Sequence, residues 1–276
     1  MPICDMHVHT RISSDADQSP ENNVFSFCET AIKRGIRHIA FTEHCDIIPD
    51  PGAITCDVAE AKRMATLAKE KYGNQLDIMH GIELAHIHRP ECKQVGEKIK
   101  QDISPDFVLG SLHINDDGTD YYTMDFSEYS DEFLLSSLDD YLSQILTFAK
   151  ECDFDSLAHC TYPLRYFHMH KRLGIVDMNK YSEPYSEIFK ALISRGKSLE
   201  INSSTLRGDY GQPLPCFDLI KLYVDLGGKK FTLGSDGHHF DLVGTKIDQV
   251  QDYIRSLGIE GVMTYHNRQE TFVKFD

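Results

Sequence analysis

The sequence lacks long apolar runs and any segment that would direct the chain to a membrane. A membrane-spanning helix needs about 18 or more consecutive apolar residues, and no run in these 276 residues approaches that length. The first ten residues, MPICDMHVHT, have neither the basic stretch nor the apolar stretch of a signal peptide. We therefore expect a cytoplasmic protein with no membrane partner.

Positive charge is also scarce. The chain has 28 Lys and Arg residues against 43 Asp and Glu residues, a net charge of −15, and it has no run rich in Lys or Arg. An acidic surface repels the nucleic-acid backbone, so we expect no nucleic-acid partner. A small anionic substrate, drawn into a local cationic site, is compatible with this charge.

The eight cysteines form no CxxC motif. Their scatter through apolar and helical stretches predicts reduced thiols in a core and argues against a disulfide scaffold. Hydrophobic residues make up 41% of the chain and charged residues 26%, as in soluble globular proteins. The length suits one α/β barrel or two smaller domains.

Seven short apolar segments alternate with amphipathic segments along the chain. The predicted strands are 3–10, 38–44, 77–85, 106–114, 156–160, 198–204 and 230–236, with a final strand in 261–275. The predicted helices are 23–34, 58–72, 90–101, 139–152, 184–195, 217–226 and 246–257. Regular βα alternation is typical of parallel strands joined by right-handed crossovers. With no composition break to mark a linker, it predicts a single α/β domain over residues 1–276, either a TIM-like (β/α)7 barrel or an open doubly wound sheet.

Histidine is abundant, with 14 copies, and metal-type side chains gather where strands end. His7 and His9 are two residues apart in the first strand, so their side chains point to the same face. Five later strands end in similar chemistry. In a barrel all these ends converge on one pocket, whereas an open sheet would spread them along a line. This shared position favours the barrel.

Taken singly, each of these residues is explained equally well as a surface or core side chain. As a set they predict a metal site, and Glu83 is informative because a carboxylate in an apolar strand is costly unless it is paired or bound to metal. The predicted ligands are His7, His9, Asp15, His44, Glu83, His113, His159, Asp236 and His238, and His239 is an alternative to its neighbour. One ion takes three or four protein ligands, so nine suit two or three divalent ions.

The segments HVHT, FTEH, GIE, GSLH, AHC and GSDGHH occur in this order along the chain. As a set they resemble the signature of the PHP (polymerase and histidinol phosphatase) metal-dependent hydrolases, and within that family the histidinol-phosphate phosphatases. The resemblance covers the whole chain and implies a distorted (β/α)7 barrel with a trinuclear site. Carried over by motif, it implies a first metal held by His7, His9, Glu83 and Asp236, a second by Glu83, His113 and His159, and a third by Asp15, His44 and His238. Many members have histidine where this chain has Asp15, and zinc, iron and manganese are all expected ions.

The resemblance implies hydrolysis of L-histidinol phosphate by in-line attack of a metal-bound hydroxide, as a step of histidine biosynthesis. Asp236, Glu83 and His113 are then the expected catalytic groups. Arg165 and Arg207 are the expected phosphate ligands, since a guanidinium fork matches phosphate oxygens, and Arg172 is a substitute for Arg165. The alternatives within the fold are a nuclease, a nucleotide phosphatase or a protein-tyrosine phosphatase. The expected partners are a small phosphate monoester and, at most, a second copy of the chain in a homodimer.

The longest predicted irregular stretch is 115–137, which contains DDGTDYYTMDFSEYS. Long loops in compact domains are often lids or substrate loops, and the alternative is a solvated insertion. Asp116, Asp117 and the loop tyrosines are candidates for binding the substrate amine.

Overall fold

A computed structural model describes residues 3–47, 56–115 and 118–276. Seven parallel strands form one sheet in chain order: β1 (Cys4–Val8), β2 (His38–Asp46), β3 (Asp77–Ala85), β4 (Phe107–Ser111), β5 (Ser156–Leu157), β6 (Ser198–Asn202) and β7 (Phe231–Gly234). The two outer strands meet, because Asp236 donates its N–H to the carbonyl of His7 at 2.8 Å and His9 donates to that of Gly237 at 2.9 Å. The predicted (β/α)7 barrel is confirmed, and the open sheet is excluded.

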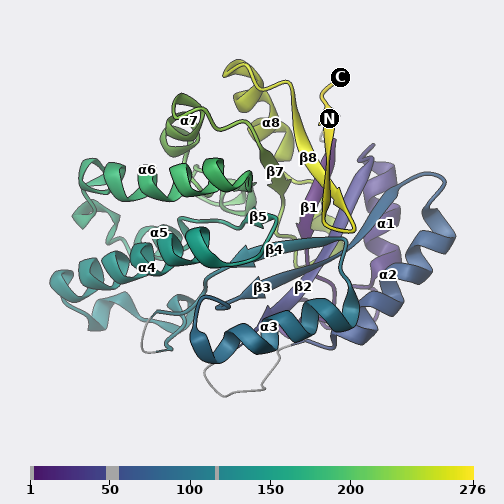
Figure 1. The fold of residues 1–276 in the computed structure, drawn as a ribbon, viewed down its shortest axis with the longest axis horizontal. Coiled ribbons are helices and arrows are strands. Elements are labelled where there is room, and N and C mark those ends of the chain that lie inside the picture. The colour runs from purple at the N-terminus through teal and green to yellow at the C-terminus, as the bar shows by residue number, and fades with distance from the viewer. Residues whose placement is uncertain (1–2, 48–55, 116–117) are drawn as a thin grey trace.

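Helices cover the outside of the barrel (Figure 1). They are α1 (Val24–Lys33), α2 (Val58–Tyr72), α3 (Pro90–Ile103), α4 (Asp131–Glu151), α5 (Tyr162–Met169), α6 (Met178–Arg195), α7 (Phe217–Asp225) and α8 (Ile247–Ser256). Each buries one apolar face, as α1 does with Val24, Phe27 and Ala31. The fit is close at β4, where a side chain on Gly110 would meet the Phe148 ring of α4 at 2.6 Å.

Two predicted helix starts are wrong by several residues. Helix α4 begins at Asp131 rather than 139, since Ser130 caps it by accepting the N–H of Phe133 and two acidic residues follow in the first turn. Helix α6 begins at Met178 rather than 184, with Asp177 as its cap and Pro184 inside it. The predicted loop 115–137 is therefore shorter, and it contains two 3₁₀ turns, at Tyr121–Thr123 and Phe126–Glu128. The tract 162–169, for which no helix was predicted, forms α5.

The C-terminal segment forms an antiparallel hairpin rather than one strand. Its strands are β8 (Gly261–His266) and β9 (Gln269–Lys274). Arg268, in the turn, donates Nε–H to Asp155 Oδ2 at 2.5 Å, and its backbone N–H bonds to the Asp106 carbonyl at 2.9 Å. Asp106 and Asp155 precede β4 and β5, so the hairpin turn contacts the barrel at the amino ends of these strands.

Among the described residues, no helix combines the length and the apolar character that crossing a bilayer requires.

Candidate metal centre

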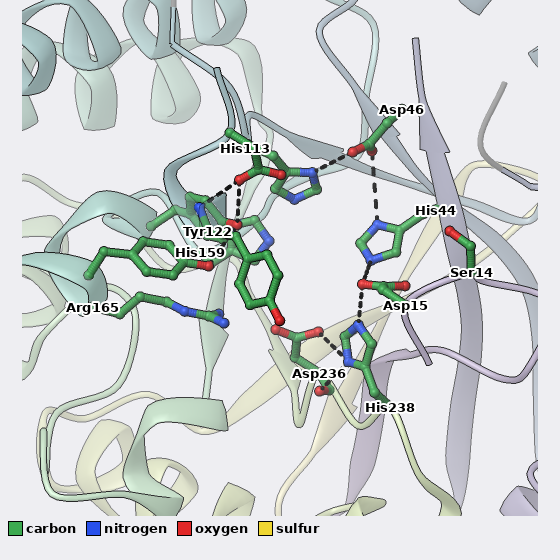
Figure 2. Close-up of a pocket in the computed structure, with 13 residues that line it drawn as sticks. Ser14, Asp15, His44, Asp46, His113, Tyr122, His159, Arg165, Asp236 and His238 are labelled. Carbon is green, nitrogen blue, oxygen red and sulfur yellow. Dashed lines mark hydrogen bonds and ion pairs between the residues drawn. The ribbon is translucent and has the colours of Figure 1, made fainter. Parts of the chain in front are cut away.

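The predicted metal ligands converge at the carboxyl ends of the barrel strands, around a cavity of about 380 Å³ (Figure 2). Its lining comes from strand ends, from the loop before α4 and from α5. The lining residues are Ser14, Asp15, His44, Asp46, His113, Asp120, Tyr122, His159, Tyr162, Arg165, Tyr166, Asp236 and His238. His7, His9 and Glu83 are fully buried and lie behind the residues that line the cavity.

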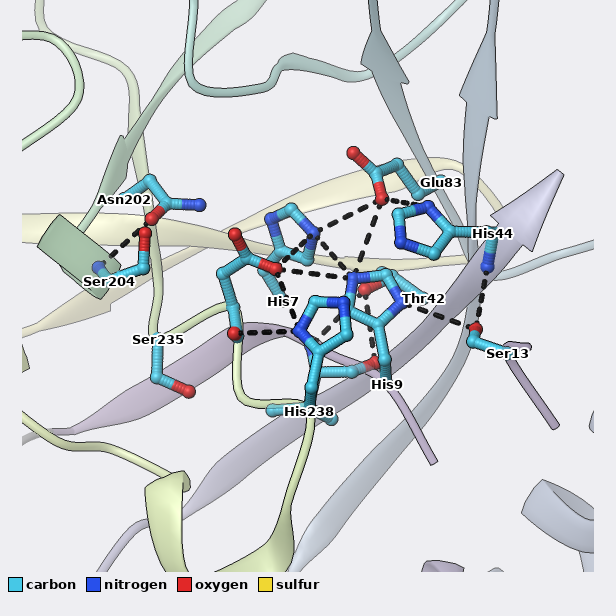
Figure 3. Close-up of polar contacts among 12 residues, drawn as sticks. His7, His9, Ser13, Thr42, His44, Glu83, Asn202, Ser204, Ser235 and His238 are labelled. Atoms are coloured by element: carbon cyan, nitrogen blue, oxygen red, sulfur yellow. Dashed lines mark hydrogen bonds and ion pairs between the residues drawn. The ribbon is translucent and has the colours of Figure 1, made fainter. Parts of the chain in front are cut away.

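The first expected group meets in a compact cluster (Figure 3). His7 Nε2 lies 2.9 Å from His9 Nε2, because both side chains leave the same face of β1. Glu83 Oε2 is 3.4 Å from each of these nitrogens. Asp236 Oδ1 is 3.6 Å from His7 Nε2 and 3.4 Å from His9 Nε2. Asp236 reaches this position from a left-handed backbone conformation, with φ of 52°.

The second expected group shares Glu83 with the first, and the third is formed by residues of its own. Glu83 Oε1 lies 3.1 Å from His113 Nε2 and 3.0 Å from His159 Nε2, so Glu83 faces two groups with its two oxygens. Asp15 Oδ2 lies 3.2 Å from His44 Nε2 and 3.1 Å from His238 Nε2. The structure thus brings all nine residues together, and their action as ligands stays a prediction.

The donor spacing suits a bound ion. At metal–ligand distances of about 2.0–2.1 Å, tetrahedral donors lie about 3.3 Å apart, and the separations given above for the first group run from 2.9 to 3.6 Å. Imidazole nitrogens together with carboxylate oxygens are donors that zinc, iron and manganese accept. The residues present therefore fit divalent ions.

The electrostatics of the cluster also favour positive charge. Burial alone would raise the pKa of Glu83, but the charges of His44, His7 and His113 hold it well below the usual range. Burial lowers the pKa of His113, yet Asp46 and Glu83 raise it to about 10. The carboxylates stay ionised and favour protonation of His113, whereas burial and the charges of His44 and His238 hold the pKa of His9 well below its usual value. Divalent cations can neutralise the carboxylates in place of these protons.

Two residues behind the ligands, Glu200 and Asp46, were missed as partners of the site. Glu200 Oε1 lies 2.6 Å from His7 Nδ1, and Asp46 Oδ2 lies 2.9 Å from His113 Nδ1. His86, expected at the surface or behind the ligands, is fully buried, and a nitrogen of its ring lies within 4.8 Å of donor atoms of Asp46 and His113. A signal was available for Glu200, because it is a charged residue in the apolar strand SLEIN, as Glu83 is in its own strand.

The two predicted phosphate ligands lie in different surroundings. Arg165 lines the cavity and points into it from α5 (Figure 2). Its guanidinium stacks on the rings of Tyr162 and Tyr166, at 5.2 and 4.9 Å, and among the described residues it forms no ion pair. Arg207 donates to the carbonyl of Ser235 at 2.6 Å and is absent from the described lining of the cavity.

The substitute and alternative residues named from the sequence do not line the cavity in the described part of the chain. Arg172 pairs with Asp131 and donates to the Phe126 carbonyl at 3.0 Å, so its contacts are with the segment at the start of α4. His239 caps a 3₁₀ turn and accepts the N–H of Asp241, so it does not replace His238 in the pocket. Asp116 and Asp117 lie outside the described residues.

Comparisons with known proteins agree with this geometry. The family model described as "PHP domain" matches residues 5–204. The histidinol-phosphatase of Lactococcus lactis is 28% identical, over 96% of this chain and 95% of that protein. The probable histidinol-phosphatase of Thermotoga maritima is 27% identical, over 94% of each. The crystal structure of the histidinol phosphate phosphatase of Lactococcus lactis, complexed with zinc, L-histidinol and phosphate, superposes with a TM-score of 0.80 at 23% identity, covering 98% of this chain and 99% of that one.

Proposed function

This chain belongs to the PHP domain family, and from that premise we propose that it is a metal-dependent phosphatase that hydrolyses L-histidinol phosphate to L-histidinol and phosphate. Relatives that match nearly its full length carry this activity in their names. The step belongs to histidine biosynthesis, and we place the enzyme in the cytoplasm.

One observation supports the proposal above the others: a guanidinium free of ion pairs among the described residues faces a cluster of histidines and carboxylates across a small cavity. Metal ions on one side and Arg165 on the other can hold a single phosphoryl group between them. A cavity of about 380 Å³ suits a small molecule. Apart from histidines, Arg165 is the one cationic residue in its described lining, which does not suit a polyanion.

Two or three divalent ions, zinc, iron or manganese, would supply Lewis acidity and lower the pKa of bound water. We assign the first ion to His7, His9, Glu83 and Asp236, the second to Glu83, His113 and His159, and the third to Asp15, His44 and His238.

The catalytic work of the chain itself is divided among four residues. Although burial opposes it, the charges of His7 and His238 hold the pKa of Asp236 well below its usual range, so its carboxylate stays ionised and orients the attacking water. Glu83 contacts ligands of the first two groups with its two oxygens. Asp46 holds the His113 ring in place through a contact with Nδ1. Arg165 would bind the non-bridging phosphoryl oxygens.

Groups on the open side of the cavity suit the rest of the substrate. Asp120 lines the cavity, and its Oδ1 accepts a hydrogen bond from the Tyr162 hydroxyl at 3.4 Å. Its carboxylate can receive the substrate ammonium in place of Asp116 and Asp117. Tyr122, Tyr162 and Tyr166 present aromatic faces against which an imidazole can pack.

Replacing Arg165 with methionine is expected to lower kcat/KM for L-histidinol phosphate about 10- to 100-fold, because a charge-assisted hydrogen bond contributes about 1.5–3 kcal/mol. Inhibition by inorganic phosphate should weaken by a similar factor, while the metal content stays unchanged. Steady-state kinetics and metal analysis measure both.

Arg63→Met is the matched control, since Arg63 is an exposed residue of α2 that pairs with Glu60. It should keep kcat/KM within about twofold. If Arg207→Met or Arg172→Met reproduces the loss while Arg165→Met does not, the assignment of the phosphate ligand to Arg165 is wrong.

The function itself is tested by assaying metal-loaded protein on L-histidinol phosphate, p-nitrophenyl phosphate, a mononucleotide, a phosphotyrosine peptide and single-stranded DNA. We expect kcat/KM of about 10⁴ M⁻¹s⁻¹ or more on L-histidinol phosphate and far lower values on the others. Equal, weak turnover of every monoester would contradict the substrate assignment. Preference for DNA, the nucleotide or the peptide would move the protein to an alternative activity of the same fold.

A further inference from the structure

We propose that Glu200, on β6, is a positioning residue that holds His7 and His159 in the orientation that metal binding requires. This inference rests on the metal centre proposed above and adds a residue to it. Strand β6 supplies none of the nine predicted ligands, and Glu200 is absent from the described lining of the cavity. It therefore acts through the ligands rather than on substrate.

Glu200 contacts two ligands with its two oxygens. Oε1 lies 2.6 Å from Nδ1 of His7, and Oε2 accepts the backbone N–H of His159 at 2.8 Å. Its side chain is 1% exposed, so water does not compete for these contacts. One carboxylate thereby ties a ligand from β1 to the segment that carries a ligand after β5.

The contact with His7 has a direct chemical consequence. An imidazole that donates Nδ1–H to a carboxylate is fixed in the tautomer whose Nε2 is a free acceptor, and its ring cannot rotate away. Nε2 is the atom of His7 that lies 2.9 Å from His9 Nε2 and faces Glu83 and Asp236. Glu200 thus presents the correct nitrogen of His7 to the first predicted ion.

The neighbouring strand leaves room for this contact. A Cβ on Gly234, in β7, would lie 2.4 Å from Glu200 Oε1 and 2.5 Å from His7 Cβ. Both distances are too short for ordinary packing, so a side chain at position 234 would displace the carboxylate or the imidazole. Gly234→Ala therefore perturbs the pair without removing either partner.

The first test is Glu200→Gln. A glutamine can accept from His7 or from His159, but its amide nitrogen cannot replace the second oxygen, so one contact is lost. We expect zinc affinity, measured by competition with a chromophoric chelator, to fall about 10- to 100-fold. Excess zinc should restore most of kcat, with KM for substrate little changed.

Asp155→Asn is the matched control for a purely structural effect. Asp155 is likewise a buried acid that accepts a backbone N–H, from Val108, but it lies at the amino end of β5, and its other partner is Arg268. This control should lower thermal stability and leave zinc affinity unchanged. If Glu200→Gln behaves in the same way, Glu200 is structural and the proposal is wrong.

Two further measurements decide the matter if Glu200→Gln does not fold. Gly234→Ala should weaken zinc binding in the same direction, and wild-type affinity in this variant would contradict the proposal. In the zinc-loaded wild-type protein, long-range ¹H–¹⁵N spectra should show His7 protonated at Nδ1, and protonation at Nε2 would also contradict it. The zinc affinities and the spectra do not use substrate, so they test the proposal whether or not L-histidinol phosphate is hydrolysed.

Discussion

Glu83→Gln is expected to lower kcat/KM at least about 10³-fold, a loss of about 4 kcal/mol of transition-state stabilisation. Glu83 is fully buried, and its two oxygens face histidines of different groups: Oε2 lies 2.8 Å from His44 Nδ1 and Oε1 lies 3.0 Å from His159 Nε2. Glutamine keeps the shape, but it removes the negative charge and one of the two acceptors that can bridge two ions. Steady-state kinetics at saturating metal, with metal analysis of the dialysed protein, should show both the lost activity and a lower bound-metal count.

Glu43→Gln is the matched control because Glu43 is also buried and lies in the adjacent strand. Its two oxygens accept from Thr10 and Ser13, through backbone N–H and hydroxyl groups. Glutamine keeps one acceptor oxygen, and a hydroxyl that faces its amide group can turn to accept from it, so only the contact with one backbone N–H is lost. We expect a loss below about tenfold in this variant. Equal losses in the two variants would show that the barrel needs buried acids in general and would remove the special role of Glu83.

Arg268→Met is expected to lower the free energy of unfolding by about 3 kcal/mol, because it leaves the buried carboxylate of Asp155 without its cationic partner. Asp155 is 5% exposed, and Arg268 also contacts Asp153 at 3.0 Å. Urea denaturation of chelator-treated protein measures the change. Activity of the metal-loaded variant at low temperature should be near that of the wild type, since the pair lies at the barrel end opposite the cavity.

The destabilisation caused by Arg268→Met should depend on pH in a defined direction. Burial raises the pKa of Asp155, and Arg268 opposes this rise in the wild-type protein. Without the arginine, ionised Asp155 costs stability above its raised pKa, and protonation removes this cost as the pH falls through that value. The difference from the wild type should therefore be smaller at pH 5 than at pH 8.

The double variant Asp155→Asn/Arg268→Met provides the control, since it replaces the ion pair with a neutral pair. It should recover much of the lost stability, and its difference from the wild type should be nearly independent of pH. A single variant as stable as the wild type at pH 8 would contradict this account.

The sequence predicts the barrel and the convergence of the ligands because both follow from local periodicity. His7 and His9 share a face through the two-residue repeat of a strand, and parallel strands bring their carboxyl ends together. The separation between donor atoms depends instead on strand register and barrel curvature. Asp46 and Glu200 contact the Nδ1 atoms of histidines on other strands. The position of Glu200 in an apolar strand marks it as unusual, but no local pattern identifies the histidine with which either acid pairs.

The errors in the sequence analysis have local causes as well. The sequence predicts a helix start at Pro184, whereas Asp177 caps that helix seven residues earlier, and the helix accommodates the proline. Ser130 followed by two acids is an ordinary helix start that the loop composition obscured. The C-terminal hairpin could not be assigned a place, since its turn is bound by acids that precede two distant strands: Asp155 accepts from Arg268, and Asp106 accepts the backbone N–H of Asn267.

The placement of His7 on the first strand and Asp236 just after the last has a consequence for how the protein matures. The complete group of four predicted ligands forms only after residue 236 has been synthesised and the segment after β7 has docked on β1. Barrel closure brings together segments far apart in the sequence, so it carries a large cost in loop-closure entropy and is expected to be slow. An ion that binds only the closed barrel stabilises it by about 2.7 kcal/mol at a free concentration of 100 times Kd. If the nine predicted ligands bind metal, metal supply would favour the last stage of folding, and we expect metal-depleted protein to be more sensitive to proteases than metal-loaded protein.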